Sequence, residues 1–414
     1  MNPLVLIAAR NLLLHRRRTL TAALAITLGF AAVNVFGGFT RYMNRSLRDG
    51  FVYSQAQGHL TVFREGFLEK GSLDPARYLF SRAETESLTA LLLRRPEVAL
   101  VTPQLQFSGL LSNGEVSTIF VASGRVPSDV DAIQSRARGF LGDLALYAGE
   151  PLRDEAPYRV GLATGLAALL DIDLEEGAIA VAPTVAGRVN ALDVTVAQLF
   201  ETSMELLNDK AMTAPLDLAW ELLDTRSADR LTVLLHRTED TDRVAALLRE
   251  SLAGRGLEVR TWETLSLLYA RVRTMFDLIF VFLFVIVLVV ASMSVFNTIN
   301  MAILERTREI GTLRALGMRG RRILVLFAVE SGILGVLGSL LGLALTLAAW
   351  LAVKVAAPTW IPPMITKRVP IEIHLVPEHL WVSFTFLLGL SVLAACLPAR
   401  RAVKQGIVRS LGHA

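Results

Sequence analysis

Residues spaced for catalysis are scarce in this chain of 414 residues. The sequence contains no G-x-x-x-x-G-K-[ST] phosphate loop, no G-x-S-x-G nucleophile turn and no H-E-x-x-H zinc motif. Its one cysteine, Cys396, excludes a multi-cysteine metal site, and its six histidines are scattered. We therefore expect no enzyme activity, no cofactor and no metal site in this chain.

The charged segment LERTREIGTLRALGM, residues 304–318, is the most distinctive stretch of the sequence. It is helix-prone, with apolar residues that can share one side and charged residues that can cover the other. Such a helix either lies on a membrane surface or docks into the groove of a partner protein. The candidate docking residues are Glu305, Arg306, Arg308, Glu309, Ile310, Gly311, Leu313, Arg314, Ala315, Leu316 and Gly317.

Glu330 is the one ionisable residue within the apolar run 323–353. An ionisable group within a membrane helix is costly, which makes it a functional candidate by default. We expect instead that Glu330 faces a neighbouring helix near the cytoplasmic surface. In the same run Gly335, Gly338 and Gly342 allow close helix packing, and the last two form a G-x-x-x-G motif.

The elements that must position these residues are apolar helices. Hydrophobic residues make up 53% of the chain and charged residues only 19%, against about 25% in soluble domains. Four runs, residues 20–39, 276–303, 323–353 and 380–397, come near or exceed the roughly 20 residues that span a bilayer. The first is long for a signal peptide, whose apolar core has about 7–15 residues. The pattern predicts four transmembrane helices.

The formal net charge of +4 conceals an asymmetry. Residues 1–19, 304–322 and 398–414 hold fourteen basic and two acidic residues, whereas residues 40–274 hold 25 basic and 32 acidic ones. Basic flanks remain in the cytoplasm, so both termini are predicted to be cytoplasmic and the large segment periplasmic. Each basic run adjoins a span. Membrane topology and contact with anionic lipids therefore explain these runs, and no nucleic-acid partner is expected.

The predicted fold is a membrane α-helical protein with a mixed α+β periplasmic domain inserted between transmembrane helices 1 and 2. Ser81 and Glu84 form a capping-box signature for a helix that Pro96 stops. Asn113-Gly114, which lies between the strand-like residues 105–111 and 116–122, predicts a type I′ hairpin. The segments are a cytoplasmic N-terminal helix (1–19), the first span (20–39), the periplasmic domain with helical stalks (40–274), the second span (275–303), the cytoplasmic loop (304–322), the third span (323–353), a short periplasmic loop (354–378), the fourth span (379–397) and a cytoplasmic tail (398–414).

The stretch ERTREIGTLRALGMRGRRILVLFAVESGILGVLGSLLG closely resembles the signature region of the MacB, FtsX and lipoprotein-releasing (LolC/LolE-like) permease superfamily of ABC transporters. The start, ARNLLLHRRRTLTAALAITLGFAAV, resembles that family's first helices, and PARRAVKQGIVRSLGH is similar to its closing segment. The resemblance implies that residues 305–317 form the coupling helix seated on an ATPase. That ATPase would be a separate dimer, which binds the ATP and Mg²⁺.

The resemblance also implies a second permease chain, identical or paralogous, across a seam built from the first two spans. The seam residues, which could contact cargo, would be Phe36, Phe39, Met275, Phe276, Ile279 and Leu283. Members of this family are thought to work by mechanotransmission, in which closure of the ATPases rearranges the outer domains and the cargo need not cross the bilayer.

Three branches of the family remain open. The length and the outer segment fit the lipoprotein-releasing type, which would extract or export a lipoprotein or another amphipathic cargo from the periplasmic side of a bacterial inner membrane. MacB-like efflux of peptides, antibiotics or siderophores with an adaptor and an outer-membrane channel is the first alternative. FtsX-like regulation of a cell-wall enzyme is the second. The candidate for a hairpin that docks a periplasmic chaperone is residues 189–204.

Overall fold

The computed structural model describes residues 3–14, 16–71, 74–137, 147–202, 207–307, 312, 314, 318–360 and 368–404. The chain forms two compact units. The helical unit comprises Met1–Met43, Val272–Thr359 and Pro370–Ala414, and the sheet unit comprises Asn44–Arg271 and Trp360–Val369.

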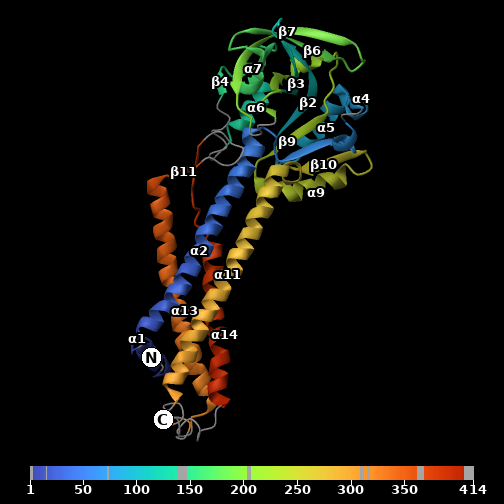
Figure 1. Ribbon diagram of the computed structural model, residues 1–414. Helices are drawn as coiled ribbons and strands as arrows, with labels where there is room; N and C mark the ends of the chain where they lie inside the picture. Colours follow the sequence, from blue (N-terminus) through green and yellow to red (C-terminus); the bar gives the residue numbers. More distant parts are fainter. Residues whose placement is uncertain are drawn as a thin grey trace. The chain divides into compact units, whose positions relative to one another are not determined.

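Long helices dominate the helical unit. They are α1 (Pro3–Leu14), α2 (Arg16–Asp49), α11 (Leu267–Glu305), α13 (Gly320–Ala356) and α14 (Pro377–Lys404), with the short strands β11 (Thr359–Trp360) and β12 (Val369–Pro370) between the last two. Within the described residues, four candidate spans, in α2, α11, α13 and α14, are long and apolar enough to cross a membrane. These helices run side by side within the unit (Figure 1).

The four long helices share one apolar core. Its fully or nearly fully buried residues include Ile26, Phe30, Val295, Ile299, Phe327 and Leu387. Large apolar side chains also point outward from the same helices, among them Leu28 in α2, Phe282 in α11 and Leu351 in α13. A helix that is apolar on every side is typical of a lipid environment.

Two predicted boundaries in the helical unit differ from the structure. The fourth span is predicted to end at residue 397, yet α14 continues through Pro398 to Lys404. Proline removes one backbone hydrogen bond, but Ala395 and Ala399 on either side are buried in the core, and this packing holds the helix together. The boundary predicted between the N-terminal helix (1–19) and the first span (20–39) also differs, because α1 ends at Leu14 and α2 already begins at Arg16.

The sheet unit carries strands β1 to β10 and short helices. The strands are β1 (Leu60–Arg64), β2 (Val98–Ser112), β3 (Ser117–Arg125), β4 (Tyr147–Gly149), β5 (Arg159–Ala163), β6 (Gly177–Pro183), β7 (Val189–Phe200), β8 (Ala211–Pro215), β9 (Arg230–Leu235) and β10 (Leu257–Thr261). The helices are η1 (Gly50–Ser54), α3 (Phe67–Lys70), α4 (Pro75–Tyr78), α5 (Arg82–Leu93), α6 (Pro127–Gln134), α7 (Thr164–Leu170), α8 (Leu216–Leu222), η4 (Thr238–Asp240), α9 (Thr241–Ser251) and α10 (Trp262–Leu265).

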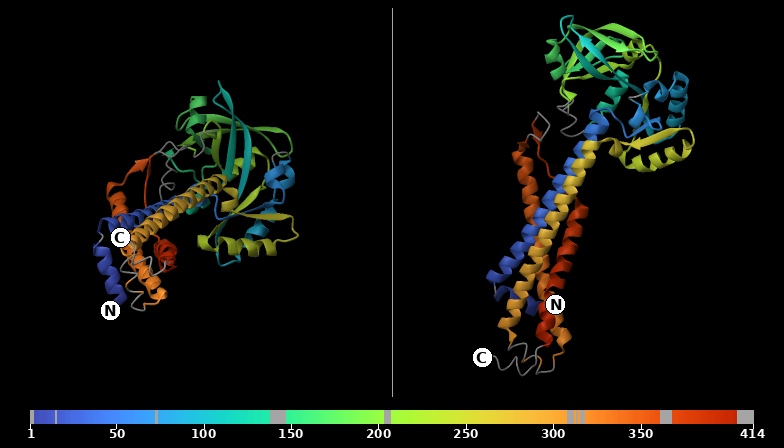
Figure 2. Two further views of the ribbon diagram at one scale, coloured as in Figure 1. Left: turned by 60° about the horizontal axis from the view of Figure 1, so that its bottom comes forward. Right: turned by 45° about the vertical axis from the view of Figure 1, so that its right-hand side comes forward.

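One half of the sheet unit has the order β10–β1–β9–β2, with every pair antiparallel. Its chain order, β1–α5–β2 and later β9–α9–β10, is that of two βαβ units in the ferredoxin-like arrangement. Helices α5 and α9 bury Leu92 and Leu248 against Val62 and Val233 of the sheet. Figure 2 shows these two helices beside the strands.

The other half closes on itself. The ladders run from β2 to β3, β8, β5, β7 and β6 and return from β6 to β2, so that this part of the described chain forms a small barrel. Strand β2 belongs to both halves, because residues 98–104 pair with β9 and residues 110–112 pair with β6. Closure leaves the barrel strands without free edges.

The capping box at Ser81 is confirmed, since Oγ of Ser81 accepts from Glu84 and the Glu84 carboxylate accepts from the Ser81 backbone. The hairpin predicted at Asn113-Gly114 is confirmed, since β2 and β3 pair in antiparallel register, but its predicted type I′ turn is wrong. Ser112 pairs with Ser117, which leaves a four-residue loop, and only Gly114 in that loop has a positive φ. Oδ1 of Asn113 accepts hydrogen bonds from the backbone of Glu115 and Val116, which favours the longer turn.

Candidate functional site

Four charged residues form two ion pairs near the start of α2, the end of α11 and the first third of α13. Arg18 at the start of α2 donates from Nη1 to Oε2 of Glu305 at 2.8 Å. Arg306, directly after α11, places Nη1 3.9 Å from Oε2 of Glu330 in α13. We call these four residues the charge junction. It connects three helices at the point where α11 leads into the segment 304–318.

The two ion pairs of the charge junction differ in burial. Glu330 is 2% exposed and the side chain of Arg306 is 12% exposed, whereas Glu305 is 49% exposed. Oε2 of Glu330 has no hydrogen-bond partner within the described residues, because Arg306 is too distant to donate one. Removing one partner of a buried pair is strongly destabilising, since the other charge is then left uncompensated.

Of the predicted coupling residues, the structure describes Glu305, Arg306 and Arg314. The other eight lie outside the described residues: Arg308, Glu309, Ile310, Gly311, Leu313, Ala315, Leu316 and Gly317. The described residues place the start of this segment against α2 and α13.

The glycines of α13 face two different helices. A Cβ at Gly338 would lie 2.7 Å from Cβ of Ile26 in α2, and one at Gly342 would lie 2.6 Å from Cβ of Phe30. Oγ1 of Thr27 also donates to the carbonyl of Gly338 at 3.1 Å. Gly335 instead faces Ser391 in α14. The G-x-x-x-G motif therefore lies at the close contact between α13 and α2.

Aromatic residues connect α2 and α11 at the predicted seam. The ring of Phe276 lies 6.2 Å from that of Phe36 and 5.8 Å from that of Phe39, measured between centroids. Phe280, which the sequence reasoning missed, stacks on Phe36 at 6.3 Å. The i, i+4 spacing of phenylalanines 276, 280 and 284 was the available signal. Of the other three predicted seam residues, Met275 and Ile279 are exposed and Leu283 is half-buried.

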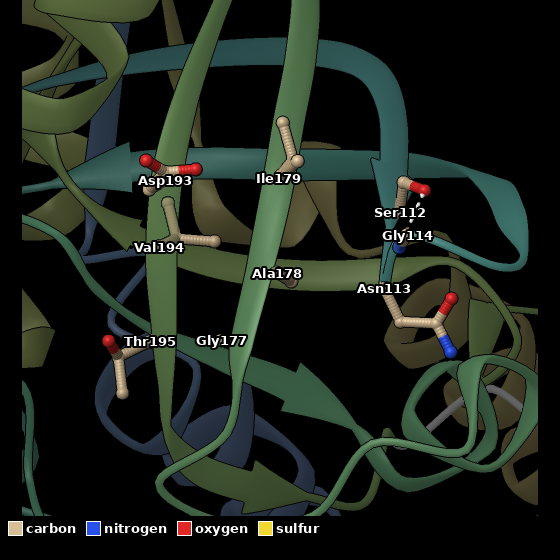
Figure 3. Close-up of a pocket in the computed structure, with 9 residues that line it drawn as sticks. All are labelled: Ser112, Asn113, Gly114, Gly177, Ala178, Ile179, Asp193, Val194 and Thr195. Carbon is tan, nitrogen blue, oxygen red and sulfur yellow. Dashed lines mark hydrogen bonds between the residues drawn. The ribbon is translucent and has the colours of Figure 1, made fainter.

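The sheet unit has an open hollow of about 280 Å³ beside the turn between β2 and β3 (Figure 3). Its lining comes from that turn and from two neighbouring strands: Ser112, Asn113, Gly114, Gly177, Ala178, Ile179, Asp193, Val194 and Thr195. Asp193 is the one ionisable residue of this lining. Within the described residues, no group of three or more His, Cys, Asp or Glu side chains could hold a metal ion.

The comparisons with known proteins agree with the membrane protein that the four apolar helices indicate. Residues 281–407 match the family described as FtsX-like permease C-terminal. This stretch includes most of α11, the segment 304–318, α13 and α14. The chain therefore contains an FtsX-like permease domain, and the resemblance seen in the sequence is confirmed.

The relatives of the chain are named as permeases. An uncharacterized ABC transporter permease of Methanocaldococcus jannaschii is 29% identical over 185 residues, which are 44% of this chain and 45% of that protein. The ABC transporter permease YtrF of Bacillus subtilis is 27% identical over 32% of this chain and 31% of its own length. The macrolide export ATP-binding/permease protein MacB of Shigella flexneri is 31% identical over 31% of this chain and 18% of its own length. The chain thus spans less than half the length of each relative.

Two solved structures overlap with about half of the chain. The periplasmic region of MacB from Actinobacillus actinomycetemcomitans is 14% identical, with a TM-score of 0.35 over 50% of this chain and 90% of that one. The extracellular domain of the transporter YknZ from Gram-positive bacteria is also 14% identical, with a TM-score of 0.34 over 49% of this chain and all of that one.

Proposed function

We propose that this chain is the membrane-spanning subunit of an ABC transporter that works with a separate ATPase dimer. The observation that carries the proposal is the coincidence of the FtsX-like domain with the charge junction at the start of the segment 304–318. This segment would be the coupling helix. ATP and Mg²⁺ would bind in the ATPase, since this sequence has no phosphate loop.

The proposed orientation places both termini in the cytoplasm of a bacterium and the sheet unit on the periplasmic side. Arginines 16–18, 321–322 and 400–401 at one end of the helices support a cytoplasmic location for that end. At the other end of α13, Nζ of Lys354 lies 5.1 Å from the ring centroid of Trp350, and Trp381 near the start of α14 is exposed. Tryptophan at that end favours a second membrane–water interface there.

Mechanotransmission is part of the proposal. Closure of the ATPase dimer would move the inner ends of α2, α11 and α13, which the charge junction connects. A second permease chain would complete the seam beside Phe36 and Phe276. The proposed cargo is a lipoprotein or another amphipathic molecule, because apolar side chains dominate the predicted seam.

MacB-like efflux is the second candidate function. It is favoured by the relatives named macrolide export proteins, although the chain covers only 18% of the one from Shigella flexneri. The molecules that copurify with the complex would distinguish the two candidate functions. Mass spectrometry of the complex purified in nanodiscs should find lipoprotein or lipid for the first function. Retention of an added macrolide instead would favour the second.

The test of the proposed function is reconstitution with the ABC ATPase of the same organism. The permease should bind the ATPase and stimulate its hydrolysis, whereas the permease alone should hydrolyse no ATP. Glu309→Lys with Arg314→Glu should weaken the complex, because both charges are predicted to face the ATPase. Arg255→Glu, an exposed charge in the sheet unit, serves as the matched control. An unchanged complex with unchanged hydrolysis would refute the coupling role.

A further inference from the structure

Adjacent residues at the end of α11 contact two different helices. Glu305 pairs with Arg18 of α2, and Arg306 lies beside Glu330 of α13. Because one peptide bond joins Glu305 and Arg306, a shift of the backbone there must act on both contacts. We infer that Arg306 and Glu330 are positioning residues that transmit movement of the segment 304–318 into the membrane helices. This inference rests on the proposed function.

The burial of the two pairs assigns them different roles. The side chains of Arg18 and Glu305 are 20% and 49% exposed, so solvent screens this pair more, and such surface pairs contribute about 0–1 kcal/mol. The pair formed by Arg306 and Glu330 is shielded from water, so its interaction is stronger and depends more sharply on distance. Transmission into α13 therefore depends on Glu330, and the contact with α2 is secondary.

The distance of 3.9 Å leaves room for a second arrangement of the buried pair. Oε2 of Glu330 has no hydrogen bond within the described residues. Movement of Arg306 toward α13 by about 1 Å would reach the 2.7–2.9 Å of a charge-assisted hydrogen bond. A contact that has an open and a closed arrangement can favour one position of the segment 304–318 over another. An element that transmits movement requires two such arrangements.

Glu330 is also placed to influence the rest of α13. Phe327, three residues before it, belongs to the common core, and Gly338, two turns after it, contacts α2. A small displacement at Glu330 therefore moves a helix that is closely packed against its neighbours, and close packing transmits strain.

The experiment uses the permease reconstituted with its ATPase in nanodiscs. Glu330→Gln removes the charge with little change of shape, and Arg306→Gln removes its partner. Each should lower the ATP hydrolysis per bound ATPase about tenfold. Glu330→Gln, which lies outside the docking segment, should also leave the amount of bound ATPase unchanged. The double variant should fall no further than either single variant, because both substitutions break the same contact. Full stimulation of ATP hydrolysis in Glu330→Gln would overturn the inference. So would a loss in the double variant that equals the product of the two single losses.

A second variant guards against simple misfolding. Arg306→Met with Glu330→Leu replaces a buried ion pair by apolar residues, a change that proteins often tolerate. This variant should fold, and its ATP hydrolysis per bound ATPase should remain as low as in the single variants. Spin labels on Leu20 in α2 and Val325 in α13, in a Cys396→Ser background, should report an ATP-dependent distance change that the variant lacks. A variant that keeps this change and full stimulation would exclude transmission through the pair.

Failure of the proposed function gives a different result. If the unmodified permease neither binds nor stimulates the ATPase, the proposed function itself fails. If it does both, and the variants behave like it, the proposed function stands and the role of Arg306 and Glu330 is refuted.

Discussion

The backbone N–H of Leu235 donates a hydrogen bond to Nδ1 of His59, with 3.1 Å between the two nitrogens. Nδ1 therefore carries no proton, and Nε2, 3.0 Å from Oγ1 of Thr238, carries the proton of the neutral ring. His59 is fully buried. Burial, together with the nearby charges of Arg48 and Arg136, lowers the pKa of His59 to about 4.

The sheet unit should become less stable in acid. Unfolding returns the pKa of His59 from about 4 to 6.5, so the unfolded chain binds the extra proton between these values. The contribution of neutral His59 to the free energy of unfolding is complete above about pH 6.5 and is lost as the pH falls toward 4. The loss should reach about 3 kcal/mol. Hydrogen exchange of the β9 amides in the full-length protein, compared between pH 7 and pH 4.5, measures it.

Two substitutions test this assignment. His59→Asn keeps an acceptor for the Leu235 amide but cannot titrate, so its β9 exchange should lose most of the acid sensitivity. His236→Asn changes an exposed histidine one residue beyond β9 and should leave that sensitivity intact. Equal acid sensitivity in His59→Asn and the unmodified protein would rule out His59 as its source.

Gly338→Leu should separate α2 from α13. Its side chain would overlap Ile26, and overpacking of this kind costs about 3 kcal/mol, against about 1 kcal/mol gained in helix propensity. Thermal unfolding in detergent should therefore occur at lower temperature. Gly389→Leu is the matched control in α14, because nothing lies within 4 Å of its Cβ position. Equal losses from both substitutions would contradict a specific contact at Gly338.

Phe276→Ala should weaken the contact between α2 and α11. It removes two ring contacts, to Phe36 and Phe39, each worth about 1 kcal/mol beyond the area buried. Detergent melting should show a loss of about 2 kcal/mol. Phe282→Ala, on an outward-facing residue that is 69% exposed, should cost much less. If Phe282→Ala is the more harmful change, the aromatic contact is not what holds these helices.

Ser81→Ala should loosen the first turn of α5. The substitution removes the side-chain acceptor of the Glu84 amide, a loss of about 1 kcal/mol for an N-cap serine. Faster hydrogen exchange at Glu84 is the expected readout. Ser87→Ala changes an exposed residue inside the same helix and should slow exchange slightly, since alanine is the better helix former. Unchanged exchange in Ser81→Ala would mean that the cap contributes nothing.

The predictable parts of this protein are those encoded by neighbouring residues. Apolar runs of helical length gave the long helices, and the spacing of Ser81 and Glu84 gave the start of α5. The type I′ turn predicted at Asn113 was wrong for a reason that is also local. Its side chain accepts two backbone hydrogen bonds and stabilises a longer turn than the Asn-Gly dipeptide predicts.

The candidate site was predictable only in its outline. Glu330 stood out because a charge in an apolar run is costly, but its neighbour could not be identified from spacing. Arg306 lies 24 positions earlier, outside the helix of Glu330, and helical periodicity relates only residues of the same helix. The sequence gave no indication of the role of His59, because nothing near it in sequence shows that η1, β9 and η4 contact its ring.

The sequence by itself determined which segments are apolar enough for a membrane, where the basic residues lie, and that no phosphate loop is present. Only the tertiary structure decided that β6 returns to β2 and closes a barrel, and that Glu305 and Arg306 contact different helices. The physical reason is the range of the forces involved. Hydrophobic periodicity and capping act within a few residues, whereas strand pairing and buried ion pairs depend on which distant segments pack together.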